Sequence, residues 1–240
     1  MSEPGKILIY DIEWKPTTAL VWRAYDENIG PDQILEHGGL LCVSAKWHGD
    51  DETMFFSEWG EGGHQAMVEE FYRVYCEADA LVTYNGDKYD NRKVMGEFLL
   101  AGLAPPPPIV SIDCLKQVKR FGLFMNRLAF VGPFFGLGKK IENEGINLWK
   151  KVMAGEPDAQ ERMTAYCIQD TELLEELYDF IRPYIYNHPF LGEGKSASCG
   201  TCGSTHRQKR GVYRTRCFVA QRYQCQGCGQ WTTGTRTKVQ

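Results

Sequence analysis

The sequence predicts an α/β protein with a mixed sheet flanked by helices, followed by a small C-terminal β module. Short apolar segments rich in β-branched residues alternate with segments of helical periodicity through most of the chain. Two of the apolar segments are separated only by a short polar turn, which is typical of an antiparallel hairpin. Strand–helix alternation combined with a hairpin predicts a sheet that contains both parallel and antiparallel pairs.

Each expected strand is apolar and is bounded by turn residues. The expected strands cover residues 6–14, 40–47, 52–57, 80–86 and 109–115. Helices are expected where apolar residues recur every three or four positions. They cover residues 64–78, 91–102 and 158–186, and residues 115–155 are expected to be mainly helical with Gly and Pro breaks.

The distribution of charge divides the chain into two parts. All 31 acidic residues lie at or before Glu193, whereas nine of the 27 Lys and Arg residues follow it. Residues 189–198 are small and polar, as in a flexible linker. We therefore predict a body at residues 1–188, a linker at 189–198 and a C-terminal module at 199–240. An acidic body with a basic module indicates two units with different partners, the basic one suited to a polyanion.

The composition is that of an ordinary globular protein. No apolar segment approaches the roughly 18 residues that a membrane helix needs. The N-terminus lacks the basic and apolar regions of a secretory signal. We therefore expect an intracellular, cytoplasmic protein without a membrane partner, in which the nine cysteines are thiols or metal ligands rather than disulfides.

Two carboxylates close the first expected strand. Asp11 and Glu13 are separated by one residue, so their side chains leave the same face of the strand and can converge on one cation. A solvated strand end is the simpler interpretation of this pair taken alone.

A third carboxylate follows a middle strand. Asp90 stands after a glycine turn, at the start of the next helix, where ligands gather in open α/β sheets. A helix N-cap is an equally good interpretation, because Asp favours that position.

The late helix carries Tyr166 and Asp170 four residues apart, so they share one face. Tyr166 also fits a core stripe with Met163 and Leu173. A buried Asp on that stripe would need a partner or a metal ion.

The four carboxylates follow one another on separate predicted elements, and this order favours a shared metal site over the separate interpretations. Hydrolysis of a phosphodiester builds negative charge, which two divalent cations about 4 Å apart can stabilise. Mg²⁺ and Mn²⁺ prefer hard oxygen ligands, and carboxylates from several elements can hold such a pair.

These motifs, in YDIEW, YNGDKYD and YCIQD, resemble those of the DEDD superfamily of 3′–5′ exonucleases, in the tyrosine-bearing branch that includes the proofreading domains of family-B DNA polymerases. The resemblance covers residues 6 to 187 and implies a ribonuclease H-like fold. It implies that Asp11, Glu13, Asp90 and Asp170 bind two Mg²⁺ or Mn²⁺ ions and that Tyr166 positions the attacking water. Asn85 belongs to the second motif and is expected to contact substrate. Lys139 and Lys140 are interpreted as a solvated helix end.

Four cysteines of the module form two C-x₂-C pairs, Cys199 with Cys202 and Cys225 with Cys228. The spacing is that of a structural zinc site, in which four thiolates complete a tetrahedron. The module resembles a zinc ribbon, and a fifth cysteine, Cys217, is expected in its core.

Basic and aromatic residues are interleaved in the module, a pattern that suits a single nucleic-acid strand because charges follow phosphates and rings stack on bases. We expect contacts from Arg214, Arg216, Arg222, Tyr223 and Trp231. The alternative is that the aromatic residues form the core of the module and the arginines only keep it soluble.

The sequence therefore predicts a metal-dependent 3′–5′ exonuclease that favours single-stranded DNA and holds it through a basic zinc ribbon, with a replication or repair protein as a further partner. Two alternatives are a non-catalytic nucleic-acid-binding adaptor and a structure-specific endonuclease on the same fold.

Overall fold

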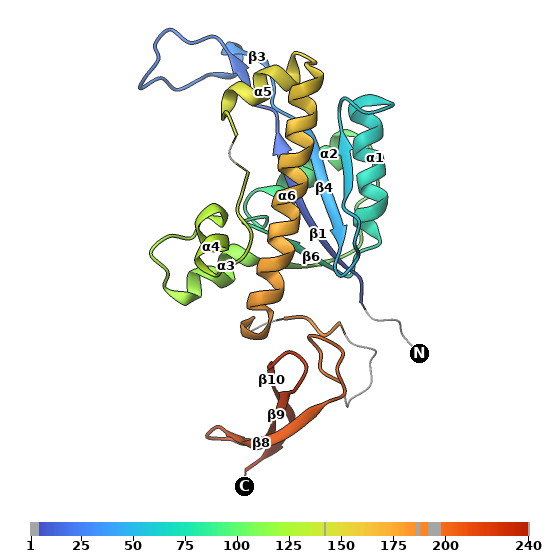
Figure 1. Cartoon of the computed structure of the whole chain (residues 1–240), viewed down its shortest axis with the longest axis vertical. Coiled ribbons are helices and arrows are strands. Elements are labelled where there is room, and N and C mark those ends of the chain that lie inside the picture. The colour runs from blue at the N-terminus through green and yellow to red at the C-terminus, as the bar shows by residue number, and fades with distance from the viewer. Residues whose placement is uncertain (1–4, 142, 186–187, 192–197, 240) are drawn as a thin grey trace.

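The computed structural model describes residues 5–141, 143–185, 188–191 and 198–239. It contains a five-stranded sheet flanked by helices and a separate three-stranded sheet. The smaller sheet lies beyond the C-terminal end of the longest helix (Figure 1). The predicted fold class is confirmed, and most of the predicted linker, residues 192–197, lies outside the described residues.

The main sheet has the strand order β5-β4-β1-β6-β7. β1 pairs with β4 antiparallel and with β6 parallel, so the sheet is mixed as expected. The β4–β5 hairpin forms one edge, and β7 forms the other. The strands are β1 Ile7–Trp14, β4 Leu40–Trp47, β5 Met54–Ser57, β6 Ala80–Thr83 and β7 Val110–Asp113.

Six α-helices occur in the described part of the chain. Their bounds are α1 Gly63–Cys76, α2 Asp90–Leu100, α3 Cys114–Val118, α4 Leu128–Phe134, α5 Ile146–Met153 and α6 Pro157–Ile181. Short 3-10 helices cover Pro31–Gln33, Lys119–Phe121 and Arg182–Tyr184, and a small hairpin pairs β2 Thr18–Ala19 with β3 Ile34–Glu36. No helix of the described residues combines the length and the apolar character that spanning a membrane requires.

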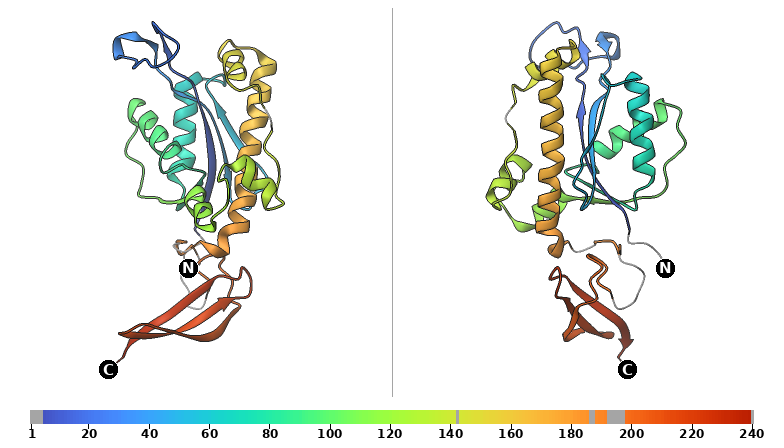
Figure 2. Two further views of the ribbon diagram at one scale, coloured as in Figure 1. Left: turned by 90° about the vertical axis from the view of Figure 1, so that its left-hand side faces the viewer. Right: turned by 45° about the vertical axis from the view of Figure 1, so that its right-hand side comes forward.

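Strand β1 separates two hydrophobic clusters because its side chains alternate between the faces of the sheet. Leu8, Tyr10 and Ile12 pack in the cluster that contains α1 and α2. Ile7 and Ile9 pack in the cluster that contains α6. Figure 2 shows the sheet between these helices. By the same alternation, Asp11 and Glu13 belong to the α6 face.

Helix α6 ends earlier than the periodicity predicts. The last α-helical residue is Ile181, and a 3-10 turn containing Pro183 follows. Proline cannot donate a backbone hydrogen bond and its ring clashes with the preceding turn, so it terminates the helix. Tyr186, the predicted end, lies outside the described residues.

The C-terminal module is built from β8 Arg207–Arg214, β9 Phe218–Cys225 and β10 Trp231–Lys238, with β9 in the centre. Two hydrogen bonds connect its first loop to the body and to the linker. The guanidinium of Arg182 donates to the carbonyl of Thr201, and the N–H of Leu191 donates to the carbonyl of Gly200 at 2.8 Å. The module therefore contacts the end of α6.

Candidate active site

Three carboxylates meet between β1 and α6. One oxygen each from Asp11, Glu13 and Asp170 lie within 4.8 Å of one another. The first two come from one face of β1, and the third comes from the middle of α6. Asp170 lies more than 150 residues after Asp11 and Glu13 in the sequence. The packing of α6 against the sheet therefore brings the three carboxylates together.

The packing is fixed by contacts between α6 and β4. Ser44 is paired with Asp11 in the β1–β4 register, and its hydroxyl donates to the carbonyl of Cys167 at 2.7 Å. It also contacts the hydroxyl of Thr171 at 2.5 Å. Because Thr171 follows Asp170 directly, these buried bonds set the position of that carboxylate relative to β1.

The electrostatics of the cluster favour a bound cation. Burial, Glu13 and the other nearby carboxylates raise the pKa of Asp11 well above its usual value. Burial is also the main cause that raises the pKa of Glu13 to about 8. The Oδ1 atom of Asp170 is buried and has no hydrogen-bond partner. Closely spaced oxygen donors with an unpartnered member fit a hard divalent ion such as Mg²⁺ or Mn²⁺.

Asp90 lies beside this cluster but outside the group of oxygens within 4.8 Å. It is buried at the first residue of α2, with Tyr89 as the N-cap, so the N-cap interpretation is wrong. Burial raises its pKa to about 6, against hydrogen bonds from its own N–H and that of Ile12. Ile12 lies between Asp11 and Glu13, and the charge of Asp90 raises the pKa of both neighbours.

Asn85 shapes the turn that leads to Asp90. Its φ angle is 73°, in the left-handed region that Asn tolerates better than most residues. Its N–H donates to Oδ1 of Asp113 at 2.9 Å, and its carbonyl accepts from Tyr89. Asp113 in turn raises the pKa of Asp90. The sequence did not single out Asp113, whose only signal was its place at the end of a strand.

Tyr166 is buried one turn of α6 before Asp170, and cavities open around it. One of about 440 Å³ is lined by Glu13, Trp14 and Trp149 as well as Tyr166. Another of about 400 Å³ is lined by Lys139 and Lys140. Burial is the main cause that raises the pKa of Tyr166 to about 12, so its hydroxyl remains protonated. The first cavity therefore reaches Glu13 of the carboxylate cluster, and the second reaches Tyr166.

Lys140 is placed differently from the sequence interpretation. Residues 137–141 are not helical, and its ammonium lies 2.6 Å from Oδ2 of Asp170. The same group lies 4.8 Å from the centre of the Tyr166 ring. Burial opposes its charge, but Asp170 outweighs that effect and raises the pKa of Lys140. The expected helix end is therefore wrong for both lysines, and only Lys139 is exposed to solvent as expected.

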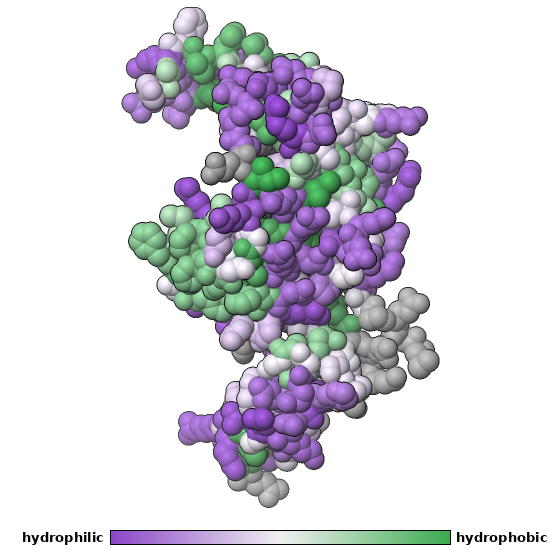
Figure 3. Space-filling model, viewed as in Figure 1, coloured by the Kyte–Doolittle hydropathy of each residue, from purple (hydrophilic) through white to green (hydrophobic). Residues whose placement is uncertain are grey.

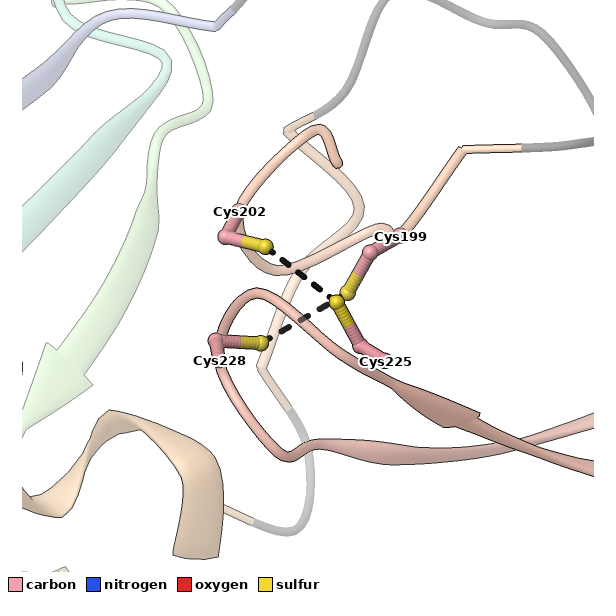
Figure 4. A group of neighbouring side chains, drawn as sticks. All are labelled: Cys199, Cys202, Cys225 and Cys228. Carbon is pink, nitrogen blue, oxygen red and sulfur yellow. Dashed lines mark hydrogen bonds between the residues drawn. The ribbon is translucent and has the colours of Figure 1, made fainter. Parts of the chain in front are cut away.

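The four predicted cysteines of the module form a second cluster (Figure 4). Their sulfur atoms all lie within 4.8 Å of one another. The Sγ separations are 3.8 Å for Cys199–Cys228 and 3.6 Å for Cys202–Cys225. A tetrahedron with Zn–S bonds of about 2.3 Å has sulfur–sulfur edges of about 3.8 Å. The geometry therefore fits a closed zinc site.

Backbone turns and charge also suit this second cluster. Gly203 and Gly229, which follow the second cysteine of each pair, have φ angles of 71° and 78°. Burial raises the pKa of Cys202 and Cys228, whereas N–H donors overcome burial at Cys225 and lower its pKa to about 7. A bound cation would relieve the repulsion between the thiolates. Cys217 is exposed, so its expected place in the core is wrong.

The module residues expected to contact nucleic acid fall into two places. Arg222 and Trp231 lie together, with the guanidinium carbon 5.7 Å from the ring centre. The guanidinium carbon of Arg207, on the neighbouring strand β8, lies 5.1 Å from the centre of the Tyr223 ring. Arg214 ends β8, and Arg216 lies in the following turn, both exposed and at the opposite end of the hairpin from the cysteines.

Comparisons with known proteins give a family and a structural relative. The model of the RNase H superfamily matches residues 36–182, which include Asp90, Tyr166 and Asp170. The chain is similar to the structure of the family B DNA polymerase from the hyperthermophilic archaeon Pyrobaculum calidifontis, at 15% sequence identity and a TM-score of 0.53. That likeness covers 76% of this chain and 25% of the polymerase, so the chain spans about a quarter of the relative. No curated protein matches.

Proposed function

Because this chain belongs to the RNase H superfamily, we propose that it is a metal-dependent 3′–5′ exonuclease that favours single-stranded DNA. The family and the fold support a nuclease that processes nucleic acid. The observation that carries the finer proposal is the meeting of Asp11, Glu13 and Asp170 within 4.8 Å, beside Tyr166 and Asp90. This is the set of side chains that the resemblance to the tyrosine-bearing exonucleases requires.

Asp11, Glu13, Asp90 and Asp170 would hold two Mg²⁺ or Mn²⁺ ions. The fit rests on hard oxygen donors and on the unpartnered Oδ1 of Asp170. When bound, such ions supply a hydroxide at neutral pH and stabilise the charge that develops on the phosphate oxygens.

The side chains around the cluster orient the substrate. The protonated hydroxyl of Tyr166 positions the attacking water next to Asp170. The cavity lined by Trp14 and Trp149 has room for the terminal nucleoside, whose base can stack on an indole ring. Lys139 and Lys140 line the second cavity beside Tyr166 and attract the phosphate backbone.

The C-terminal module would be held together by one Zn²⁺ bound to Cys199, Cys202, Cys225 and Cys228. A unit of this size buries little apolar surface, so the metal would provide much of its folding free energy. Its proposed role is to bind the substrate strand. The residues proposed to contact substrate are Asn85 in the body and Arg214, Arg216, Arg222, Tyr223 and Trp231 in the module. A replication or repair protein is a further proposed partner.

Digestion of end-labelled strands tests the proposal. The protein is incubated with Mg²⁺ or Mn²⁺ and single-stranded DNA or RNA, either as linear strands with a 5′ label or as circles with an internal label. A 3′–5′ exonuclease shortens linear strands one nucleotide at a time and leaves circles intact. Cleavage of circles would instead show an endonuclease, and the absence of hydrolysis with either metal would show a non-catalytic binding protein.

A further inference from the structure

A cleft of about 760 Å³ lies where the body meets the C-terminal module. The body contributes Arg120 and Tyr184, and the module contributes residues of all three of its strands. In Figure 1 this junction lies directly beyond the last turn of α6. The cleft is therefore a joint feature of the two units and is separate from the carboxylate cluster.

Among the residues that the structure describes, the walls of the cleft carry positive charge and no carboxylate. The charged side chains that line it are Arg120, Arg207, Arg222 and Arg236. Within the described part of the chain, neither Arg222 nor Arg236 forms an ion pair. The module has no acidic side chain that could neutralise them, since Glu193 is the last one in the sequence. A concave surface of one sign of charge concentrates the opposite charge.

Exposed aromatic rings line the same cleft. Tyr184 is 70% exposed and Trp231 is 47% exposed, and Phe190 and Tyr213 also face solvent. Two further lining residues, Gln230 and Thr232, each have a buried side-chain oxygen without a hydrogen-bond partner. Charges, rings and unpartnered polar atoms together suit a single nucleic-acid strand, because an acidic peptide would use the charges but not the rings.

A row of aromatic residues runs from the active-site cavity to this cleft. Pro133 lines the cavity that contains Lys139. Next to it, Phe134 contacts Phe135, Phe135 contacts Phe121, and Phe121 contacts Tyr184, with ring centres 5.5, 6.4 and 6.0 Å apart. Figure 3 shows apolar surface over α3 and α4, above the polar C-terminal module. The row offers successive stacking positions along the side of α6.

The distance between the two sites sets a length. Asp170 and Ile181 are eleven residues apart in one helix, which is about 17 Å at 1.5 Å per residue. A stacked strand covers that distance in about five nucleotides, at about 3.4 Å each. A strand must therefore be longer than about five nucleotides to occupy the carboxylate cluster and the cleft together.

We propose that the cleft binds the 5′ part of a single-stranded nucleic acid whose 3′ end lies at the carboxylate cluster, so that the enzyme holds long strands and releases short ones. The polarity of the strand rests on the proposed exonuclease function, whereas binding in the cleft does not require hydrolysis. The two can therefore be tested apart.

Binding is measured with 5′-fluorescein-labelled oligothymidylates of 4 and 20 nucleotides, in an Asp11→Asn background that prevents hydrolysis. We expect the double variant Arg222→Ala/Arg236→Ala to bind the 20-mer about tenfold less tightly at 0.1 M salt. The slope of log affinity against log salt concentration should fall by about 1.4, or about 0.7 for each lost phosphate contact. The 4-mer should bind the double variant as it binds the parent.

The matched control is Lys209→Ala/Arg210→Ala, which removes two charges from β8 outside the cleft. It should change affinity for the 20-mer less than twofold, and equal unfolding midpoints show that both variants are folded. Equal losses of affinity for the 20-mer in the two double variants would mean that the positive charge of the module attracts the strand without a specific site. That result would overturn the proposal that the cleft is the binding site. An unchanged affinity of the cleft variant for the 20-mer would overturn it as well, and an equal loss with the 4-mer would overturn the proposal that one strand occupies both sites.

Digestion of a 5′-labelled 30-mer separates this proposal from the nuclease. The parent protein should accumulate products of about five or six nucleotides, and the cleft variant should dissociate throughout and lose that accumulation. If neither protein hydrolyses the strand, the proposed exonuclease function is wrong, and the binding measurement still tests whether the cleft binds the strand. If both hydrolyse it with the same product pattern, the cleft fails while the nuclease stands.

Discussion

The ammonium of Lys140 lies 2.6 Å from Oδ2 of Asp170, one of a group of carboxylates that otherwise repel one another. The side chain of Asp170 is almost fully buried and that of Lys140 is 29% exposed. The lysine thus supplies positive charge where the proposed metal ions would supply it. This cation belongs to a non-helical segment that the sequence analysis interpreted as a solvated helix end.

Lys140→Ala should therefore lower stability in buffer without Mg²⁺ and strengthen metal binding. Loss of the ion pair costs about 1–2 kcal/mol, less than for a fully buried pair because water partly screens the lysine. Urea unfolding with and without Mg²⁺ measures both effects, since a bound ion replaces the lost charge and reduces the deficit. Lys139→Ala, at the exposed neighbour, is the control and should match the parent. An unchanged Mg²⁺ dependence in Lys140→Ala would contradict the competition between lysine and metal.

Asp11→Asn should abolish hydrolysis without destabilising the fold. Burial and the charge of Glu13 raise the pKa of the Asp11 carboxylate. The neutral isostere Asn therefore removes both the repulsion between Asp11 and Glu13 and a proposed metal ligand. We expect the rate to fall by a factor of about 10³ or more, a loss of roughly 4 kcal/mol in transition-state stabilisation. The free energy of unfolding should stay equal or rise. Glu172→Gln, at an exposed carboxylate of α6, should keep full activity. Normal turnover by Asp11→Asn would remove Asp11 from the site.

Tyr166→Phe should slow turnover less severely than loss of a carboxylate. The hydroxyl positions water but binds no metal in the proposed arrangement, so its removal should reduce kcat about 10- to 100-fold. KM for single-stranded DNA and the Mg²⁺ concentration for half-maximal rate should change little. Steady-state kinetics at several Mg²⁺ concentrations separate these quantities. A kcat equal to that of the parent would show that the hydroxyl takes no part in the reaction.

The sequence predicts the parts of this molecule that depend on local patterns. Period-two alternation in β1 placed Asp11 and Glu13 on one face, and helical spacing placed Tyr166 with Asp170. The spacing of the cysteines predicted their meeting in the module. Such patterns constrain residues close in sequence, and only the resemblance to known exonucleases suggested that the separate motifs meet.

Other features depend on the path of an aperiodic segment or on the contact between two units. Lys140 lies in a segment of glycine and lysine whose route to α6 no periodicity specifies. The cleft arises because α6 ends at Ile181 and the first loop of the module bonds there. Asp90 was equally consistent with a cap and with a ligand, because both positions begin a helix after a strand. Only the packed structure shows it as the first helical residue, beside Ile12.

Zinc removal should unfold the C-terminal module and leave the body folded. Cys228→Ser removes one of four sulfur ligands, and a small module without its metal loses most of its folding free energy. We expect one zinc ion per chain in the parent and none in the variant, with at least about tenfold weaker binding of single-stranded DNA. Cys217→Ser is the control, because this exposed thiol lies outside the cluster. Equal zinc content in all three proteins would exclude the proposed ligand set.

Stability should fall as pH rises from about 6.5 to about 9 because of His64. Its imidazole lies between Glu58 and Glu97 and binds a proton there. Hydrogen bonds to these carboxylates stabilise the positive ring and raise its pKa to about 9. A base with a raised pKa stabilises the fold fully below its unfolded-state pKa, and that stabilisation disappears as pH passes the folded-state value. The ring is 40% exposed, so solvent screening limits the effect to about 1 kcal/mol.

Urea unfolding of the parent and His64→Gln at pH 6, 7.5 and 9.5 isolates this contribution of His64. The difference in free energy of unfolding between the two proteins should be largest at pH 6 and should vanish at pH 9.5, since the parent then carries a neutral ring. His37→Gln, at an exposed histidine, should follow the parent at every pH. A difference that stays constant from pH 6 to 9.5 would mean that His64 stabilises the fold through packing, and not through its charge beside Glu58 and Glu97.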